Sequence, residues 1–173
     1  MEKNQFNHIK IHTHYSICEG AIKISELKDL CKERKIKAIG LNDSHNLFGA
    51  LEFSENISKV GTQPIIGSQI NFKHKNTIGQ LCLIASNING YKKIVELSSK
   101  SYLENDNLND PHCSLDELFN INEGVIVLTG SVKGLFGIML EKGFDNEIND
   151  IFIKLKKHLK NNFYIEIQST IKL

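Results

Sequence analysis

The chain has 173 residues and a formal net charge of +1, from 21 basic and 20 acidic side chains. This length suits one domain with a single core, and the balanced charge excludes a general electrostatic attraction to nucleic acid or membranes. Four cysteines without a Cys-x-x-Cys pair argue against a zinc knuckle and favour a reducing compartment. The polar N-terminus and the absence of a long apolar run predict a cytoplasmic location without membrane contact.

Short apolar runs alternate with helical patterns along most of the chain. This order favours an α/β fold with a largely parallel sheet. The expected strands are residues 8–14, 37–42, 63–71, 80–86, 124–129 and 163–168. The expected helices are residues 25–35, 47–60, 89–103 and 146–160, and the last shows the cleanest helical spacing of apolar residues. The polar, turn-rich residues 104–113 are expected to form a surface loop.

The end of the chain bears on the domain organisation. Only five residues follow the last expected strand, 163–168. A barrel built from these units would still be open and would leave an unpaired strand at its edge. We therefore expect one domain over residues 1–173 that lacks its last barrel strands.

The first expected strand contains the main candidate residues. Its side chains alternate between two faces, and Ile9 and Ile11 share one of them. The other face carries His8, Lys10, His12 and His14. Imidazoles two residues apart, followed by Glu19 in the next turn, suit a metal site, whereas the ammonium group of Lys10 does not.

A second group of candidates follows strand 37–42. Loops at the carboxyl ends of barrel strands converge on one mouth, so Asp43 and His45 are expected to meet the first group there. Such a mouth could bind zinc or manganese and activate water against a phosphoester. The candidate ligands are His12, His14, Glu19, Asp43 and His45.

The same residues have a purely structural interpretation. A histidine or aspartate at a strand end is more often part of a hydrogen-bond network than a ligand. Lys10 would repel a bound cation and could supply the positive charge that Glu19 and Asp43 need. A lysine–carboxylate cluster could therefore replace a metal centre.

The remaining candidates are weak. His8 is expected to bond backbone at the bottom of the barrel, and no role is assigned to His74, His112 or His158, which lie in turns or on a polar helix face. The segment 130–134 (GSVKG) could cradle a phosphate, but it lacks the full spacing of a phosphate-binding loop. A plain strand-to-helix turn is the better interpretation.

Several segments carry a resemblance to a known family. They are residues 8–16 (HIKIHTHYS), 19–21, 43 with 46–53, 63–67 (QPIIG), 89–94 with 97–98, 123–130 (EGVIVLTG) and 163–168 (FYIEIQ). In this order they resemble the N-terminal PHP (polymerase and histidinol phosphatase) domain of bacterial replicative DNA polymerase III alpha subunits, the C-family polymerases. That resemblance implies a distorted β/α barrel, usually seven-stranded, whose intact sites hold two or three metal ions and hydrolyse phosphoesters, including the 3′ end of DNA.

The resemblance also shows where this chain departs from the family. Its anchors at residues 15–16 and 19–20 place the family's His-x-His motif at positions 10 and 12, so Lys10 replaces a histidine. Further replacements are Ser44 for His, Gln69 for Glu, Gln80 for His and Ser131 for Cys. The family ligands that remain are His12, Glu19 and Asp43, with His14 and His45 as possible substitutes. The family's late Asp-x-His motif would lie beyond Leu173.

These comparisons of motifs imply a function. The chain is expected to be a fragment of a DNA-directed DNA polymerase, a nucleotidyltransferase of DNA replication, whose catalytic palm is not in this sequence. The departures predict a metal-free, catalytically inactive barrel, with Lys10 as the charge that replaces the metal. This domain would support the polymerase thumb and dock an epsilon-type proofreading exonuclease.

The implied partners are the thumb and palm of the alpha subunit, that exonuclease, and DNA through the parent enzyme. No cofactor is expected for the fragment; magnesium belongs to the parent polymerase, and zinc or manganese would bind only if the PHP site were active. Two alternatives stay open. One is an active metal-dependent PHP phosphoesterase or 3′–5′ exonuclease, and the other is a free-standing small PHP protein.

Overall fold

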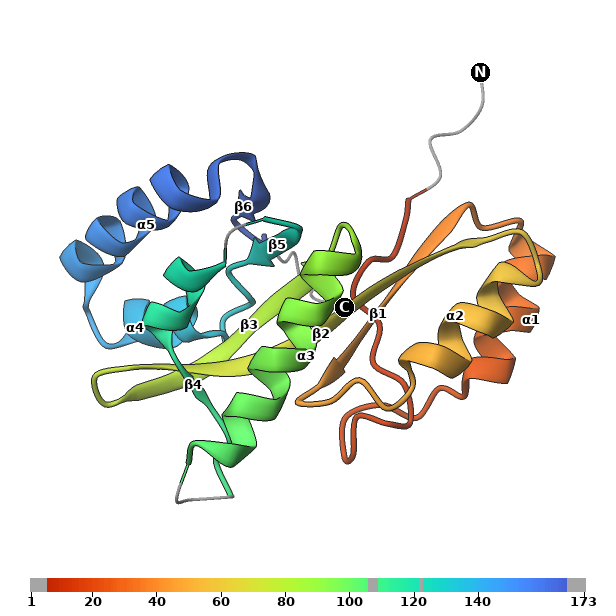
Figure 1. The fold of residues 1–173 in the computed structure, drawn as a ribbon, viewed down its shortest axis with the longest axis horizontal. Helices are drawn as coiled ribbons and strands as arrows, with labels where there is room; N and C mark the ends of the chain where they lie inside the picture. Colours follow the sequence, from red (N-terminus) through yellow and green to blue (C-terminus); the bar gives the residue numbers. More distant parts are fainter. Residues whose placement is uncertain (1–5, 106–108, 122, 168–173) are drawn as a thin grey trace, which may run out of the picture.

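The computed structural model describes residues 6–105, 109–121 and 123–167. The elements, in chain order, are α1 (Ile24–Arg34), β1 (Ala38–Ser44), α2 (Ala50–Ser58), β2 (Gln63–His74), β3 (Thr77–Ala85), α3 (Ile88–Leu103), β4 (Cys113–Ser114), η1 (Leu115–Asn120), β5 (Val125–Leu128), α4 (Leu135–Glu141), α5 (Asp145–Leu159), η2 (Lys160–Asn162) and β6 (Phe163–Tyr164). Helices α1 and α2 lie together at one end of the molecule and α4 and α5 at the other, with the long strands between them (Figure 1). The expected α/β class is confirmed.

The strands form one mixed sheet in the order β1-β2-β3-β5-β6, and β4 pairs with the far end of β2. The β1–β2, β2–β4 and β5–β6 pairs are parallel, whereas β3 is antiparallel to both β2 and β5. The prediction of a largely parallel sheet is therefore wrong around β3. The reason is a two-residue turn between His74 and Thr77, in which Lys75 has a φ of +53°, because so short a turn joins only antiparallel strands.

The first expected strand, 8–14, is an extended segment rather than a regular strand. Its backbone follows β1, since the Ile11 N–H donates to the Gly40 carbonyl at 3.0 Å and the Gly40 N–H donates to the His8 carbonyl at 2.7 Å. A side chain at Gly40 would place its Cβ 2.3 Å from the Ile9 carbonyl oxygen. Only glycine allows this close approach. The regular pairing is limited to isolated bridges, such as the one between Ile11 and Leu41.

The four expected helices are all present as α1, α2, α3 and α5, with ends shifted by a few residues. Four short elements were not predicted: β4, which begins at the last residue of the expected loop 104–113, and η1, α4 and η2. The expected strand 163–168 is regular only over the two residues of β6, and Gln168 lies outside the described residues.

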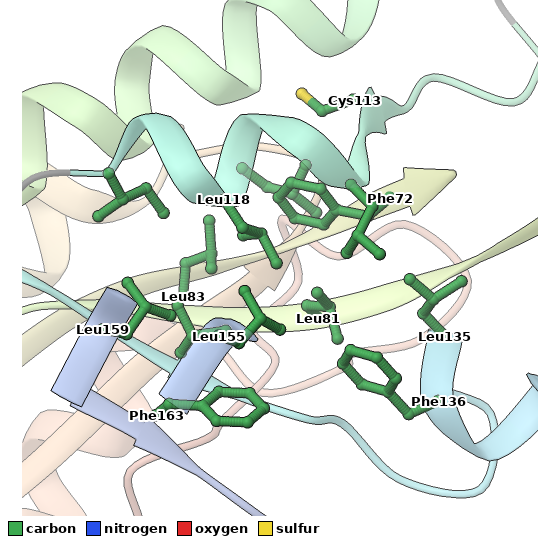
Figure 2. Packing of buried hydrophobic residues seen from close by; sticks show 14 of the residues in the cluster. Phe72, Leu81, Leu83, Cys113, Leu118, Leu135, Phe136, Leu155, Leu159 and Phe163 are labelled. Carbon is green, nitrogen blue, oxygen red and sulfur yellow. The ribbon is translucent and has the colours of Figure 1, made fainter. Parts of the chain in front are cut away.

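One face of the sheet packs against the helices. Its largest apolar cluster joins alternate residues of β2, β3 and β5 to α3, η1, α4, α5 and β6 (Figure 2). Side chains that meet there include Phe72, Leu81, Leu83, Leu118, Leu135, Phe136, Leu155, Leu159 and Phe163. A second cluster joins α1 and α2 to Ile39 and Leu41 of β1. Each fully buried side chain of this size contributes roughly 1.5–3 kcal/mol to folding.

The opposite face of the same strands is the one on which the candidate residues lie, and we call it the helix-free face. Side chains alternate along a strand, so burial of Ile70 and Phe72 in the core directs Gln69 to this face. The register places Cys82 of β3 opposite Gln69 and Asn42 of β1 beside Gly67. The part of this face on the amino-terminal side of Gln69 in β2 is apolar. Ile65, Ile84 and Ile126 line an open groove there, with a volume of about 940 Å³.

Three of the cysteines, Cys31, Cys82 and Cys113, are buried, and all four are free thiols. Burial raises the pKa of both Cys82 and Cys113 to about 12, so these thiols stay protonated at neutral pH. Among the described helices, none has the length and apolarity that a membrane span requires.

Candidate functional site

The N-terminal segment brings two candidates to the helix-free face. Ile11 pairs with Leu41 and packs in the second core cluster, so the alternate residues Lys10 and His12 point the opposite way. The chain then turns back at residues 14–20. A Cβ at Gly20 would lie 2.1 Å from the Thr13 carbonyl oxygen, so the turn closes this tightly only with glycine.

His12 is held by the side-chain amide of Gln69. The Gln69 Nε2 atom lies 3.2 Å from His12 Nε2 and 3.3 Å from Gln80 Oε1. An amide nitrogen can only donate, so Gln69 gives one hydrogen to each partner. His12 Nε2 is thereby an acceptor, and the ring proton sits on Nδ1, 3.3 Å from Ser16 Oγ. The nitrogen that would face a metal is already engaged.

The Asp43 carboxylate accepts hydrogen bonds from the N-terminal segment. One oxygen accepts the Thr13 N–H at 2.7 Å and the Ser16 hydroxyl at 2.6 Å, and the other accepts the Thr13 hydroxyl at 2.8 Å. The residue is fully buried. Three donors to one carboxylate fasten the N-terminal segment to the end of β1.

Glu19 and His45 both lie near the end of β1, each with its own partners. The Glu19 carboxylate accepts a hydrogen bond from the Ser44 hydroxyl, and its Oε2 atom lies 3.6 Å from His12 Nδ1. His45 has a φ of +60°, and its N–H donates to the Gln69 carbonyl at 2.8 Å. Within the described residues, its Nδ1 is buried without a hydrogen-bond partner. Burial lowers the pKa of His45, and the Glu19 charge offsets this only in part, so the ring is neutral at pH 7.

Lys10 binds a carboxylate that the sequence interpretation did not consider. Its Nζ atom lies 2.9 and 3.2 Å from the two carboxylate oxygens of Glu166, and both side chains are largely buried. The expected pairing of Lys10 with Glu19 or Asp43 is therefore wrong. Asp43 accepts hydrogen bonds from Thr13 and Ser16, and Glu19 contacts Ser44 and His12.

A sequence signal for Glu166 did exist. The segment 163–167 (FYIEI) is apolar except for this one carboxylate, which alternation places on the same side as Tyr164. The Glu166 N–H donates to the Thr129 hydroxyl at 3.0 Å, which extends the link to β5 beyond the regular strand. An acid at that position in an apolar strand needs a buried cation or a hydrogen-bond donor.

The other histidines lie outside this group. His14 is exposed in the turn; its Nδ1 faces the Ile22 carbonyl at 3.4 Å and its ring stacks on Tyr15. His8 is exposed and contacts Phe6, and its carbonyl accepts a hydrogen bond from the Gly40 N–H.

The three histidines without an assigned role have local partners. His74 lies 3.3 Å from the Glu147 carboxylate, His112 faces the carbonyl of Asp110, and His158 donates to the carbonyl of Ile121.

Segment 130–134 forms a turn that leads into α4. The Gly134 N–H donates to the Ser131 carbonyl at 2.8 Å, and the Lys133 N–H faces the Ser131 hydroxyl at 3.4 Å. These N–H groups are used within the turn, so they are not arranged for a phosphate. The interpretation as a plain strand-to-helix turn agrees with this geometry.

The residues at the mouth do not fit a metal centre of two or three ions. Across residues 6–105, 109–121 and 123–167, no three His, Cys, Asp or Glu side chains are grouped so that they could hold an ion. His12 Nε2 faces an amide donor, and the Asp43 oxygens face three donors. The Lys10 ammonium occupies the helix-free face, where it would repel a cation.

The comparison with known proteins identifies the class to which this fold and mouth belong. The PHP domain family matches residues 8–170, and the chain belongs to this family. Its relatives include the DNA polymerase III subunit alpha of Borreliella burgdorferi, 34% identical over 178 residues, and that of Rickettsia felis, 35% identical over 164 residues. These alignments cover 96% and 94% of this chain but 15% and 14% of the relatives, so the chain spans about one seventh of their length.

A solved structure from Bifidobacterium adolescentis, named as a candidate metal-dependent phosphoesterase, is also similar. It aligns with a TM-score of 0.46 at 16% identity, over 58% of this chain and 34% of that one. The resemblance to PHP domains of replicative polymerases that the motifs indicated is confirmed by the family match and by the named relatives.

Proposed function

We propose that this chain is the PHP-domain part of a replicative DNA polymerase III alpha subunit, and that the domain is a metal-free structural module within that enzyme. The first half of the proposal is supported by relatives of that name along nearly the whole chain. The second half is supported by one observation above all. The Gln69 amide donates to both His12 and Gln80, and so engages the His12 nitrogen that a metal ion would have to use.

The hydrogen bonds around Gln69 form a continuous chain. They run from Gln80 through Gln69 to His12, then through Ser16 to Asp43. A metal ion that used His12 Nε2 would have to displace the Gln69 amide and leave Gln80 without this donor. Each buried polar group left unsatisfied costs about 1–3 kcal/mol, which the ion would have to offset.

The Lys10–Glu166 pair supplies the remaining charge balance. It connects the N-terminal segment to the residues after β6, across 156 positions of sequence. In this proposal Lys10 replaces the metal as the positive charge of the helix-free face. A largely buried pair of this kind is costly to break, because either partner alone remains as a poorly solvated charge.

The activity of the whole enzyme would then reside elsewhere in the longer protein. In this proposal the DNA-directed polymerase chemistry and its magnesium belong to the palm, and proofreading comes from a separate epsilon-type exonuclease. The PHP domain would support the thumb and provide a docking surface for that exonuclease, and DNA would reach it through the assembled enzyme in the cytoplasm. The domain itself would need no cofactor.

Metal analysis tests the proposal. The purified chain is incubated with zinc or manganese, freed of unbound ions by gel filtration, and analysed by mass spectrometry for metal content. The matched variant is Lys10→His/Gln69→Glu/Gln80→His, which restores three family ligands. We expect substoichiometric metal in the unmodified chain and a gain in the variant, with circular dichroism to confirm that both are folded.

Two results would contradict the proposal. Stoichiometric metal in the unmodified chain, with release of nucleotides from a 3′ DNA end, would support the active phosphoesterase or exonuclease instead. A native protein of 19.6 kDa on an immunoblot, rather than one several times larger, would support a free-standing PHP protein.

A further inference from the structure

Helix α5 presents a strongly basic surface at the end of the molecule opposite α1 and α2 (Figure 1). Its apolar face is packed into the core through Ile148, Ile151, Leu155 and Leu159. The outward side of its second half and the residue after it carry four exposed lysines, Lys154, Lys156, Lys157 and Lys160. Residues 151–165 contain these four lysines and no acidic residue, although the whole chain has a net charge of only +1.

Carboxylates do not neutralise these four lysines, in contrast to three lysines elsewhere in the protein. Lys75, Lys93 and Lys100 each lie 2.8–3.1 Å from a glutamate oxygen. Within the described parts of the chain, no ion pair within 4.0 Å involves the four lysines of this surface, even though Asp150 lies one turn before Lys154. The charge on this surface is available to an external anion.

Helix stability does not explain the whole group. Cations in the last turn interact favourably with the helix dipole, which accounts for Lys156 and Lys157. Lys154 precedes that turn, and the spacing 154/157 places two like charges one helical turn apart, where they repel. An opposing polyanion would remove this repulsion.

An aromatic groove lies directly beside the lysines. Phe119 of η1, Lys154, Lys157 and His158 line it. The rings of Phe119 and His158 meet edge to face, with centroids 5.8 Å apart and planes at 63°. His158 Nε2 donates to the Ile121 carbonyl at 2.8 Å, which fixes the orientation of its ring. The groove therefore offers a partly exposed, preorganised aromatic surface between two ammonium groups.

We propose that this surface binds single-stranded nucleic acid. The lysines contact phosphates along the strand, and a base stacks in the groove against Phe119. Lysines interleaved with aromatic rings are the arrangement that binds single strands without sequence preference. An acidic peptide would use the lysines but would gain little from the aromatic ring. This inference goes beyond the proposed structural role and does not depend on the metal state of the helix-free face.

The test measures the anisotropy of a fluorescein-labelled oligothymidylate titrated with the chain at several sodium chloride concentrations. We expect binding that weakens with salt. In Lys154→Gln/Lys157→Gln, the slope of log K against log salt should decrease by about 1.4, because each lost phosphate contact on a single strand contributes about 0.7. The matched control, Lys28→Gln/Lys32→Gln on α1, removes the same charge at the other end of the molecule and should leave both affinity and slope unchanged.

A second variant separates stacking from charge. Phe119→Leu keeps the apolar volume of this partly buried side chain, so the fold is retained, but it removes the aromatic face. We expect an affinity loss of about fivefold or more with an unchanged salt slope. Circular dichroism and the thermal midpoint confirm that each variant is folded.

Three outcomes would overturn the proposal. The first is no binding by the unmodified chain at low salt. The second is an equal loss of affinity in the α1 control variant, which would show that binding depends on overall charge and not on this surface. The third is competition by a polyglutamate peptide as strong as that by oligothymidylate, together with unchanged binding by Phe119→Leu, which would assign the surface to an acidic protein segment.

Discussion

The two faces of the sheet are made by the same strands but are held together by different forces. On the helix-packed face, buried side chains such as Phe72 and Leu83 are stabilised by removal of apolar area from water. On the part of the helix-free face around Gln69 and Lys10, the contacts are hydrogen bonds and one ion pair. Apolar packing is non-directional and tolerates change, whereas the second arrangement works only if every donor has its acceptor.

This difference explains why the residues of the mouth can vary while the fold remains. The packed face supplies most of the folding free energy, so the mouth needs only to satisfy its own polar groups. Glutamines at positions 69 and 80 and a lysine at position 10 do this with ordinary hydrogen bonds and one carboxylate partner. The three predictions below test whether the two faces contribute to stability as unequally as this account requires.

The largest effect is expected on the packed face. Phe72→Ala removes a fully buried ring from the main cluster and should lower the free energy of unfolding by about 3–5 kcal/mol. Urea denaturation followed by circular dichroism measures this change. Phe48→Ala, at a position that is 79% exposed, is the control and should cost less than about 0.5 kcal/mol. Equal costs at the two positions would contradict the assigned core.

An intermediate effect is expected from the ion pair on the helix-free face. Lys10→Met should lower stability by about 1–3 kcal/mol, because the largely buried Glu166 carboxylate loses its ammonium partner. The double variant Lys10→Met/Glu166→Gln should be more stable than Lys10→Met alone, since it no longer buries that charge. A double-mutant cycle in urea measures the coupling. Simple additivity of the two single changes would show that the pair does not hold the strands together.

The smallest effect is expected from His45 and depends on pH. Its pKa is lowered in the folded state from 6.5, so the unfolded chain takes up a proton at a higher pH than the folded protein does. Stability should therefore fall as pH decreases through 6.5 toward the folded-state pKa, and it should recover as pH rises. His45→Asn keeps a residue type that tolerates the positive φ and should reduce this loss.

Urea midpoints at pH 7.5 and 5.5 test the His45 prediction. The exposed His14→Asn serves as the control and should keep the pH dependence of the unmodified chain. The pKa values of Glu117 and Glu147 are lowered, from 4.5, by hydrogen bonds to Asn120 and to Lys75 as the largest causes, so these groups titrate below this range. An unchanged pH dependence in His45→Asn would contradict the role of burial.

Part of the candidate site was accessible from the sequence. Alternation along residues 8–14 predicted that Lys10 and His12 share one face, which agrees with the structure. Glu19 was expected near His12 because it follows the next turn, and its carboxylate does lie beside the His12 ring. Asp43 and His14 were harder to assign. Asp43 directs its oxygens to the backbone of Thr13, and His14 already belongs to the turn, so strand alternation no longer applies to it.

The sequence by itself determined the α/β class, the four long helices and the family, because these depend on local periodicity and on residue identities at known spacings. Only the tertiary structure decided the antiparallel course of β3, the Gln69 bridge between His12 and Gln80, and the choice of Glu166 as the partner of Lys10. The physical reason is the sequence separation over which each kind of interaction acts. A helix or strand pattern is set by neighbours within a few residues, whereas Lys10 and Glu166 are 156 residues apart, and only the closed register of the intervening strands brings them within hydrogen-bond distance.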